Sequence, residues 1–206
     1  LISKNAHLYT EMIVANAILR GDRNKLLSFK KVLNPVTLQI GGSNPEELAE
    51  ACKISENYGY REINLNLGCP SKKVQKNKFG ACLMQEPDLV ARCIEAMAKA
   101  TKLPITIKTR IGYNEVEDFE FLKSFVQRTK DAGSQKFIIH ARKALLKKLS
   151  PKENLNIPPL KYDFVYKLKE YFKNDEIIIN GGVKTINEIK DHLKKVNGVM
   201  IGRAIY

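Results

Sequence analysis

The sequence predicts an α/β fold, a TIM (β/α)8 barrel that lacks its first strand in this chain. Strand-like apolar segments alternate with amphipathic helices throughout the 206 residues, which is typical of a parallel sheet covered by helices. No GxGxxG motif follows the first strand, so the main sign of a doubly wound dinucleotide-binding sheet is missing. Polar residues end one strand after another along the chain, as in barrel enzymes, whereas an open sheet gathers them at one switch point.

The expected elements follow one another in a regular order. Seven strands are predicted, one fewer than a closed barrel contains. They cover residues 8–13, 36–40, 62–67, 105–109, 136–141, 176–180 and 198–201. Apolar residues recur between them at helical spacing. The helices are marked by Leu48, Ala51 and Cys52; Val90, Ile94 and Met97; Leu122, Phe125 and Val126; Phe164, Leu168 and Tyr171; and Ile186, Ile189 and Leu193.

Local start and stop signals agree with this order. Asn44, Pro45 and Glu47 form a helix cap, a first-turn proline and an acidic residue three positions on. Thr185 and Glu188 have the same spacing, which predicts a capping box. Glycines stand where turns are due after helices or strands. These glycines are Gly59, Gly133, Gly181 and Gly182.

Composition predicts one domain, residues 1–206, with a substantial core. Hydrophobic residues make up 44% and charged residues 28% of the chain, and no apolar run approaches the roughly 20 residues that a membrane span needs. The first residue is Leu1 and no signal-peptide pattern follows it, so we expect a truncated chain. The four cysteines form no CxxC pair. A reduced, cytoplasmic protein is the better interpretation, with an organelle left open because the native N-terminus is missing.

The formal net charge is +13, which favours an anionic partner and nucleic acid in particular. The competing interpretation is a lysine-rich composition spread over every surface. The placement of the charges along the chain has to decide between the two.

The segment 64–71 runs off the end of a predicted strand. Gly68 and Pro70 are expected to fix a tight turn that holds the Cys69 side chain over the barrel mouth. A thiol is mostly protonated at neutral pH, which suits a proton donor better than a nucleophile. The alternative is that Cys69 is only a small turn residue.

A phosphate site is predicted where the last two strands end. Asn180, Gly181 and Gly182 follow one strand, and Gly202 and Arg203 follow the next. Barrels commonly hold a phosphate at these two loops with bare backbone amides, and glycine lets the backbone approach the ligand closely. Two ordinary turns are the alternative.

Three further side chains at strand ends suit a flavin. Lys108 and His140 end two neighbouring strands. A cation at that place would stabilise an anionic reduced ring, and the imidazole would bond the ring edge or the phosphate. Gln39 has the donor and acceptor that pair with an imide edge. His7 and His192 are interpreted only as satisfied polar residues.

Several motifs in this order resemble the tRNA-dihydrouridine synthase family, and the resemblance covers essentially the whole chain. The motifs are INLNLGCPSKKVQKNKFGACLM (63–84), PITIKTRIG (104–112), FIIHARKA (137–144), LSPKENLNIPPLKY (149–162), INGG (179–182) and GVMIGRAIY (198–206). The HARKA and SPKEN segments look like the A-type branch, which modifies uridines 20 and 20a in the D-loop of tRNA. The resemblance implies FMN as cofactor, NADPH as electron donor and tRNA as partner. The family's first strand would precede Leu1, and its helical RNA-binding domain would follow Tyr206.

The resemblance also implies a role for each matching residue. Cys69 corresponds to the general acid that protonates C5 of the uracil after hydride from FMN reaches C6. Asn66 corresponds to a residue at the substrate base, and Arg142 to a position near the cofactor or the RNA. The implied flavin contacts are Gln39, Lys108 and His140, and the implied phosphate cradle is Asn180, Gly181, Gly182, Gly202 and Arg203.

Two lysine clusters flank this expected site. The first, Lys72, Lys73, Lys76 and Lys78, follows Cys69, and the second, Lys143, Lys147, Lys148 and Lys152, follows His140. Contacts to phosphates from this rim would position an RNA while the pocket accepts a flipped base. Two other functions stay open: an FMN barrel acting on free pyrimidines, and an RNA-binding barrel without catalysis.

Overall fold

The computed structural model describes residues 6–30, 34–146 and 149–205. Its strands are β1 (Leu8–Tyr9), β2 (Ile13–Val14), β3 (Val36–Gly41), β4 (Glu62–Leu67), β5 (Ile105–Arg110), β6 (Lys136–His140), β7 (Glu176–Asn180) and β8 (Gly198–Met200). Its α-helices are α1 (Ala15–Arg20), α2 (Arg23–Leu27), α3 (Pro45–Ser55), α4 (Lys72–Lys76), α5 (Pro87–Ala100), α6 (Phe119–Asp131), α7 (Tyr162–Tyr171) and α8 (Ile186–Leu193). Short 3-10 helices are η1 (Glu56–Tyr58), η2 (Gly80–Gln85), η3 (Glu153–Leu155) and η4 (Arg203–Ile205).

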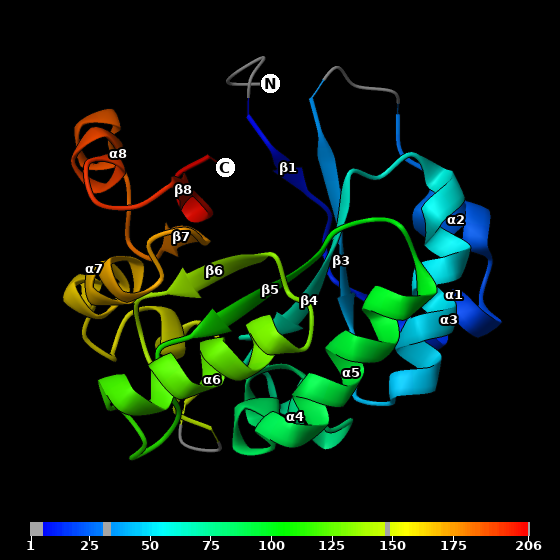
Figure 1. Ribbon diagram of the computed structural model, residues 1–206, viewed down its shortest axis with the longest axis horizontal. Coiled ribbons are helices and arrows are strands. Elements are labelled where there is room, and N and C mark those ends of the chain that lie inside the picture. The colour runs from blue at the N-terminus through cyan, green and yellow to red at the C-terminus, as the bar shows by residue number, and fades with distance from the viewer. Residues whose placement is uncertain (1–5, 31–33, 147–148, 206) are drawn as a thin grey trace.

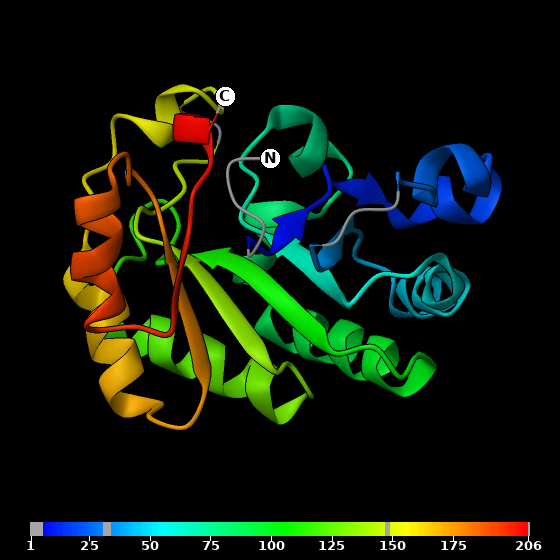
Figure 2. The ribbon, with the colours of Figure 1, turned by 90° about the horizontal axis from the view of Figure 1, so that it is seen from above.

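The strands form one parallel sheet in the order β1-β3-β4-β5-β6-β7-β8, and β2 also pairs with β3. Figure 1 shows the strands side by side in chain order, and Figure 2 shows the sheet curling with the helices on its outer side. Helices on one side only distinguish this sheet from a doubly wound one, which carries them on both faces. The architecture is a curled half-barrel, as expected of an incomplete TIM barrel, so the predicted fold class is confirmed.

The two faces of the sheet differ in chemistry because successive side chains of a strand point to opposite sides. Outward side chains such as Leu38, Leu65 and Ile107 are apolar, fully buried and packed into the core under the helices. Inward side chains are mostly polar. The polar inward set is Thr37 and Gln39 on β3; Glu62, Asn64 and Asn66 on β4; Thr106, Lys108 and Arg110 on β5; His140 on β6; and Asn180 on β7.

Helices α3, α5 and α6 cover the outer face with the side chains predicted from their spacing. Leu48, Ile94 and Phe125 are at most 2% exposed. The two predicted caps are present as well. The Asn44 side chain accepts from the Glu47 amide, and Thr185 and Glu188 form a reciprocal capping box. Both caps fix a helix start directly after a strand and its turn, which sets where the turns at the strand ends lie.

The structure corrects two details of the sequence prediction. The expected strand 8–13 is broken into β1 and β2, because the Thr10 hydroxyl accepts from the Gln39 amide where a backbone carbonyl would do so in a continuous ladder. The outer faces of α7 and α8 are also less covered than their spacing suggests. Tyr171, Ile186 and Leu193 are 59%, 71% and 48% exposed.

The N-terminal end of the inward face is closed by an ion pair. Lys136 Nζ lies 2.7 Å from Glu62 Oε2, and both side chains are largely buried. The Tyr9 hydroxyl donates to Glu62 Oε1 at 3.0 Å, and burial followed by the Glu62 charge raises the pKa of Tyr9.

Candidate active site at the strand ends

The strand register brings the predicted polar residues together at the C-terminal rim. Asn66 on β4 lies opposite Lys108 on β5. One layer further, Arg110 lies opposite His140, which in turn lies opposite Asn180 on β7. Residues that are far apart in sequence therefore share one end of the sheet.

A chain of side-chain amides connects β3, β4 and β5. Gln39 Nε2 donates to Asn64 Oδ1 at 3.0 Å, and Asn64 Nδ2 donates to Thr106 Oγ1 at 2.9 Å. Asn66 Nδ2 donates to Gln39 Oε1 at 2.8 Å. Each bond fixes which end of an amide faces which neighbour, so Gln39 and Asn66 are held in one orientation. Asn64 has no predicted role; its signal in the sequence is the polar alternation Glu62, Asn64, Asn66.

Asn66 also holds the turn that contains Cys69. Asn66 Oδ1 accepts from the backbone amides of Gly68 and Cys69 at 3.1 and 3.0 Å. From the other side, the Ala81 amide donates to the Cys69 carbonyl at 2.9 Å. Gly80 makes this approach possible, because its φ is +74° and a Cβ there would lie 2.6 Å from the Cys69 carbonyl oxygen. Cys69 is thus a partly exposed thiol on a rigid turn.

Arg110 is the most enclosed cation of the rim, with 3% of its surface exposed. Its Nε donates to the Gly68 carbonyl at 2.8 Å. One terminal nitrogen donates to the carbonyls of Lys143 and Asn154 at 3.0 and 3.2 Å. Burial lowers the pKa of Arg110 to about 10, so the guanidinium stays charged at neutral pH. The sequence places Arg110 at a strand end, but its role was not predicted.

Lys108 and His140 are electrically coupled at the rim. Burial first, and the Arg110 charge second, lower the pKa of Lys108 to about 8, against an opposing effect of Cys69. Burial lowers the pKa of His140 to about 2, and the neighbouring cations Lys108 and Arg110 act in the same direction. His140 is therefore a neutral imidazole. Its buried Nδ1 has no hydrogen-bond partner within the described residues.

The predicted phosphate cradle combines open and crowded positions. Gly181 and Gly182 have φ of +119° and +72°, which non-glycine residues rarely adopt. The Tyr162 hydroxyl donates to the Gly181 carbonyl at 2.6 Å, while a Cβ on Gly202 would meet no heavy atom within 4 Å. Asn180 Nδ2 donates to the Met200 carbonyl at 2.8 Å, so its amide ties β7 to β8.

Two arginines hold the loop that contains η3. Arg142 donates to the carbonyls of Asn156 and Pro158, and its buried Nε has no partner in the described part of the chain. The exposed Arg203 donates to Asn156 Oδ1 at 3.0 Å and to the Leu155 carbonyl. Both predicted cations therefore lie around one loop beside the glycine turns.

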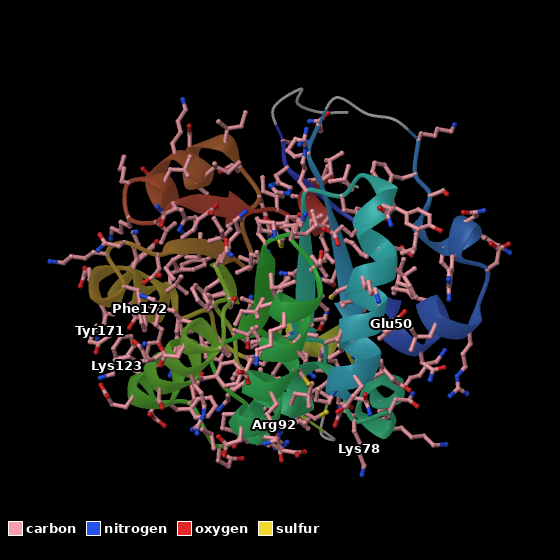
Figure 3. All side chains as sticks on the ribbon, turned by 45° about the vertical axis from the view of Figure 1, so that its right-hand side comes forward. Glu50, Lys78, Arg92, Lys123, Tyr171 and Phe172 are labelled. Atoms are coloured by element: carbon pink, nitrogen blue, oxygen red, sulfur yellow. The ribbon has the colours of Figure 1, made fainter. Side chains whose placement is uncertain are left out.

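The two lysine clusters differ in how free their charges are. Lys72, Lys73, Lys76 and Lys78 are exposed, and Figure 3 shows Lys78 at the periphery of the molecule, beyond α4. In contrast, Lys143 Nζ lies 3.1 Å from Glu117 Oε2, and Lys161 Nζ lies 3.3 Å from the same oxygen. Lys147 and Lys148 lie outside the described residues.

The other predicted polar residues have ordinary partners. His7 Nε2 lies 2.6 Å from Thr37 Oγ1, and His192 Nδ1 lies 2.8 Å from the Tyr166 hydroxyl. Cys52 and Cys93 are free and buried on α3 and α5. No helix in the described residues has the length and apolar character that crossing a membrane requires.

A curled parallel sheet with titratable groups at its strand ends defines the class of barrel-type α/β enzymes. A solved 2,3-dimethylmalate lyase has a similar fold (TM-score 0.56, 11% identity, 84% of this chain and 55% of that chain). An uncharacterized conserved protein from Geobacillus kaustophilus does as well (TM-score 0.53, 11% identity, 97% of this chain and 81% of that chain). At these identities the likeness concerns the fold alone.

The family model described as "Dihydrouridine synthase (Dus)" matches residues 2–206. The chain belongs to the dihydrouridine synthase family. It is 52% identical to a tRNA-dihydrouridine(20/20a) synthase of Synechocystis sp., with 100% of this chain and 61% of the relative covered. It is 53% identical to the protein of the same name from Yersinia pestis, with 100% and 60% covered. The chain thus spans about three fifths of the length of these relatives.

Membership of this family implies a flavin cofactor, and the rim has groups that fit one. His140 Nδ1 and Arg142 Nε are buried and without a partner within the described residues. No ion pair or hydrogen bond engages Lys108 Nζ in the same part of the chain. At Gly202, after β8, no heavy atom lies where a side chain would begin, so the backbone there is open to a ligand. An anionic, planar ligand with a phosphate would satisfy these groups.

Proposed function

We propose that the full-length protein reduces uridine to 5,6-dihydrouridine in the D-loop of tRNA, at positions 20 and 20a, with FMN as cofactor and NADPH as reductant. Residues 1–206 are proposed as its FMN-binding barrel domain. The observation that carries this proposal is the Cys69 turn, which Asn66 and Gly80 hold rigidly at the rim that also presents Lys108. The relatives whose names state this activity match along the whole chain.

The proposed cofactor site combines groups that have no partner in the described residues, such as His140 Nδ1, with side chains that already bond within the rim, such as Gln39. Lys108 and Gln39 would face the pyrimidine edge of the flavin, and His140, as a neutral imidazole, would donate or accept one hydrogen bond there. The backbone amides of Gly181, Gly182 and Gly202, with Asn180 and Arg203, would hold the phosphate. These residues would hold FMN, which when reduced would supply the hydride for C6 of the uracil.

Cys69 then completes the reduction. Its S–H bond breaks as a C5–H bond forms, and sulfur keeps the electron pair as a thiolate. The hydride at C6 and this proton at C5 together saturate the double bond. Asn66 holds the turn through its side-chain oxygen, Oδ1. We propose that the same side chain also contacts the base at the rim. Arg110 and Lys108 supply positive charge beside the developing thiolate.

The tRNA is proposed to approach over α4. The four exposed lysines Lys72, Lys73, Lys76 and Lys78 have no ion-pair partner within the described residues, so their charges are available to phosphates. Arg142 and Lys143 are proposed to approach the RNA on the other side of the rim. A phosphate that reaches Lys143 has to compete with Glu117.

The test replaces the proton donor in the full-length protein. Cys69→Ala is expected to bind flavin and tRNA but to reduce uridine about 10²–10⁴ times more slowly, as is typical when a general acid is lost. The assay is single-turnover oxidation of the reduced enzyme by unmodified tRNA. Cys82→Ala is the matched control, because Cys82 is also partly exposed but bonds the Phe79 carbonyl. A normal rate in the Cys69 variant would contradict the assignment, and reduction of free uracil without tRNA would favour a free-pyrimidine reductase.

A further inference from the structure

We propose that Arg110 is a positioning residue that holds the Cys69 turn in register with the loop after β6 and stabilises the thiolate that proton transfer leaves behind. This inference rests on the proposed role of Cys69 as proton donor. It assigns two tasks to the Arg110 guanidinium. The mechanical task is to hold the Cys69 turn in place, and the electrostatic task is to stabilise the Cys69 thiolate.

The mechanical task follows from the three carbonyls that Arg110 bonds. They belong to three different segments: Gly68 in the turn before Cys69, Lys143 after β6, and Asn154 in η3. A guanidinium is planar and presents several donors in a fixed geometry, so segments that share one are fixed relative to each other. An ammonium in its place would act as a point charge on a flexible stem.

The segment on the far side of Arg110 is itself rigid. The Asn154 side chain is fully buried and accepts from the Leu145 amide at 2.7 Å. Its Nδ2 donates to the carbonyls of Leu145, Leu149 and Ser150. The position of this loop therefore fixes the Arg110 guanidinium, and the guanidinium in turn fixes Gly68, one residue before the proposed proton donor.

The electrostatic task follows from the absence of a carboxylate. Among the described residues, no Asp or Glu forms an ion pair with Arg110, although the side chain is 3% exposed. Buried charges in proteins are ordinarily paired. Here backbone carbonyl dipoles compensate the guanidinium, and one of these carbonyls belongs to Gly68, the residue directly before Cys69; a negative charge on Cys69 favours the charged form of Arg110. A thiolate at Cys69 would supply the missing negative charge at the moment the proton leaves.

Two variants of the full-length protein separate the tasks. Arg110→Met removes both the charge and the planar set of hydrogen-bond donors. Arg110→Lys keeps a positive charge but loses the planar set of donors. Arg92→Met, on the exposed surface of α5, is the control for loss of one positive charge from the outer layer (Figure 3). For each variant we would measure flavin content, kcat and KM for tRNA, and the pH dependence of Cys69 alkylation by iodoacetamide, read on the Cys69 peptide by mass spectrometry.

We expect Arg110→Met to alkylate about tenfold more slowly than wild type near neutral pH, because the reacting thiolate loses the stabilising guanidinium charge. Its kcat should fall by about 10²–10³, as for loss of a group that stabilises transition-state charge, with KM nearly unchanged. Arg110→Lys should alkylate like wild type yet lose about tenfold or more in kcat. Arg92→Met should match wild type in both measurements.

The alkylation profile keeps the inference distinct from the proposed function. If Arg110→Met and wild type alkylate identically, the electrostatic task is overturned, whatever the catalytic role of Cys69. If Arg110→Lys retains full kcat, the mechanical task is overturned. If Cys69→Ala remains fully active while Arg110→Met still shows slow alkylation, the proposed proton donor is wrong but the Arg110–Cys69 coupling stands. Should Arg110→Met not fold, Arg110→Lys still tests the mechanical task, which a normal kcat would refute.

Discussion

His140 shows how the rim sets the protonation of a single residue. Its imidazole is 6% exposed and lies among cations. Burial, and after it the nearby positive charge, disfavours a second proton, so the ring is neutral at neutral and mildly acidic pH. A neutral ring keeps one donor and one acceptor nitrogen, which suits a hydrogen bond to a flavin better than a fixed cation would.

This protonation state predicts a pH dependence of stability. The folded pKa of His140, about 2, lies below the ordinary value of 6.5, so the unfolded chain binds more protons between these values. Above pH 6.5 the imidazole is neutral in both states, so it does not change the free energy of unfolding with pH. Below pH 6.5 the unfolded chain gains a proton that the folded chain does not, so the free energy of unfolding falls. Between pH 7 and 5 the loss should be about 2 kcal/mol. His140→Gln should lose less unfolding free energy over this range, measured by denaturant titration of the full-length protein.

His192→Gln is the control for that measurement. Burial also lowers the pKa of His192, but Glu188 and Asp191 oppose the shift, so replacing it should change the pH slope less. Equal slopes for His140→Gln and wild type would show that His140 is not buried as a neutral ring.

At the residue scale, sequence predicts which side chains reach the rim but not how they pair. Cys69, Lys108, His140 and Asn180 lie where their positions at strand ends predict. The bonds of Gln39 to Asn64 and Asn66 depend on the register between β3 and β4, which no local pattern specifies. The ion pair of Lys143 with Glu117 joins residues from two loops, so the lysine count after His140 overstates its free charge.

At the scale of elements, the turn after β7 combines strain with function. Gly182 has φ of +72°, and a Cβ there would lie 2.6 Å from the end of the Leu160 side chain. Alanine at a left-handed position costs about 1–2 kcal/mol. Gly182→Ala should therefore lose stability and also, by covering the amides proposed to hold phosphate, bind flavin about tenfold or more weakly. Flavin occupancy of the purified full-length protein measures the second effect.

Gly59 offers a matched control for backbone strain. Its φ is +87°, and an added Cβ would meet no atom within 4 Å. Gly59→Ala should share the loss of stability, because its backbone is equally left-handed, but it should retain flavin because it follows η1, away from the rim. The proposed cradle would be wrong if both variants kept full flavin occupancy.

Helix α4 and Lys78, two positions after its end, carry the prediction for tRNA. Replacing Lys72, Lys73, Lys76 and Lys78 by Gln in the full-length protein should weaken tRNA binding while flavin content stays constant. Each lost phosphate contact should reduce the slope of log affinity against log salt by roughly 0.7–0.9. Filter binding across a salt series would measure this slope.

Four exposed lysines on the outer layer serve as controls for α4. They are Lys53, Lys102, Lys167 and Lys190. Their joint replacement by Gln removes the same charge, and it should leave the salt slope almost unchanged. Equal effects of the two sets would mean that the RNA responds to diffuse net charge, and the proposed docking over α4 would fail.

Element boundaries were predicted well where local signals exist and poorly where tertiary contacts decide. The caps at Asn44 and Thr185 start their helices as expected, because capping is local. The division of strand 8–13 depends on a bond from the Gln39 amide to Thr10, some thirty positions away in the chain. The exposure of Ile186 and Leu193 likewise depends on what lies over α8 and cannot be read from spacing.

For the whole molecule, the order of strands and helices was sufficient to predict a parallel sheet that curls. A barrel is favoured over an open sheet because polar residues end one strand after another and no GxGxxG motif follows the first strand. The net charge of +13 was a weaker guide. Several of its cations are engaged internally, as Lys136 is with Glu62 and Lys143 with Glu117, and only placement identifies those that face solvent.

The alternation of polar and apolar residues along the strands has an evolutionary consequence. Odd and even positions of one strand serve separate purposes: one set packs against the helices, and the other lines the proposed active site. Substitution at rim positions such as Cys69 or Lys108 can therefore alter chemistry without disturbing the packed layer of Leu65 and Ile107. Descendants of one ancestral scaffold can diverge in the reactions they catalyse while the selection that preserves their folding acts on different residues.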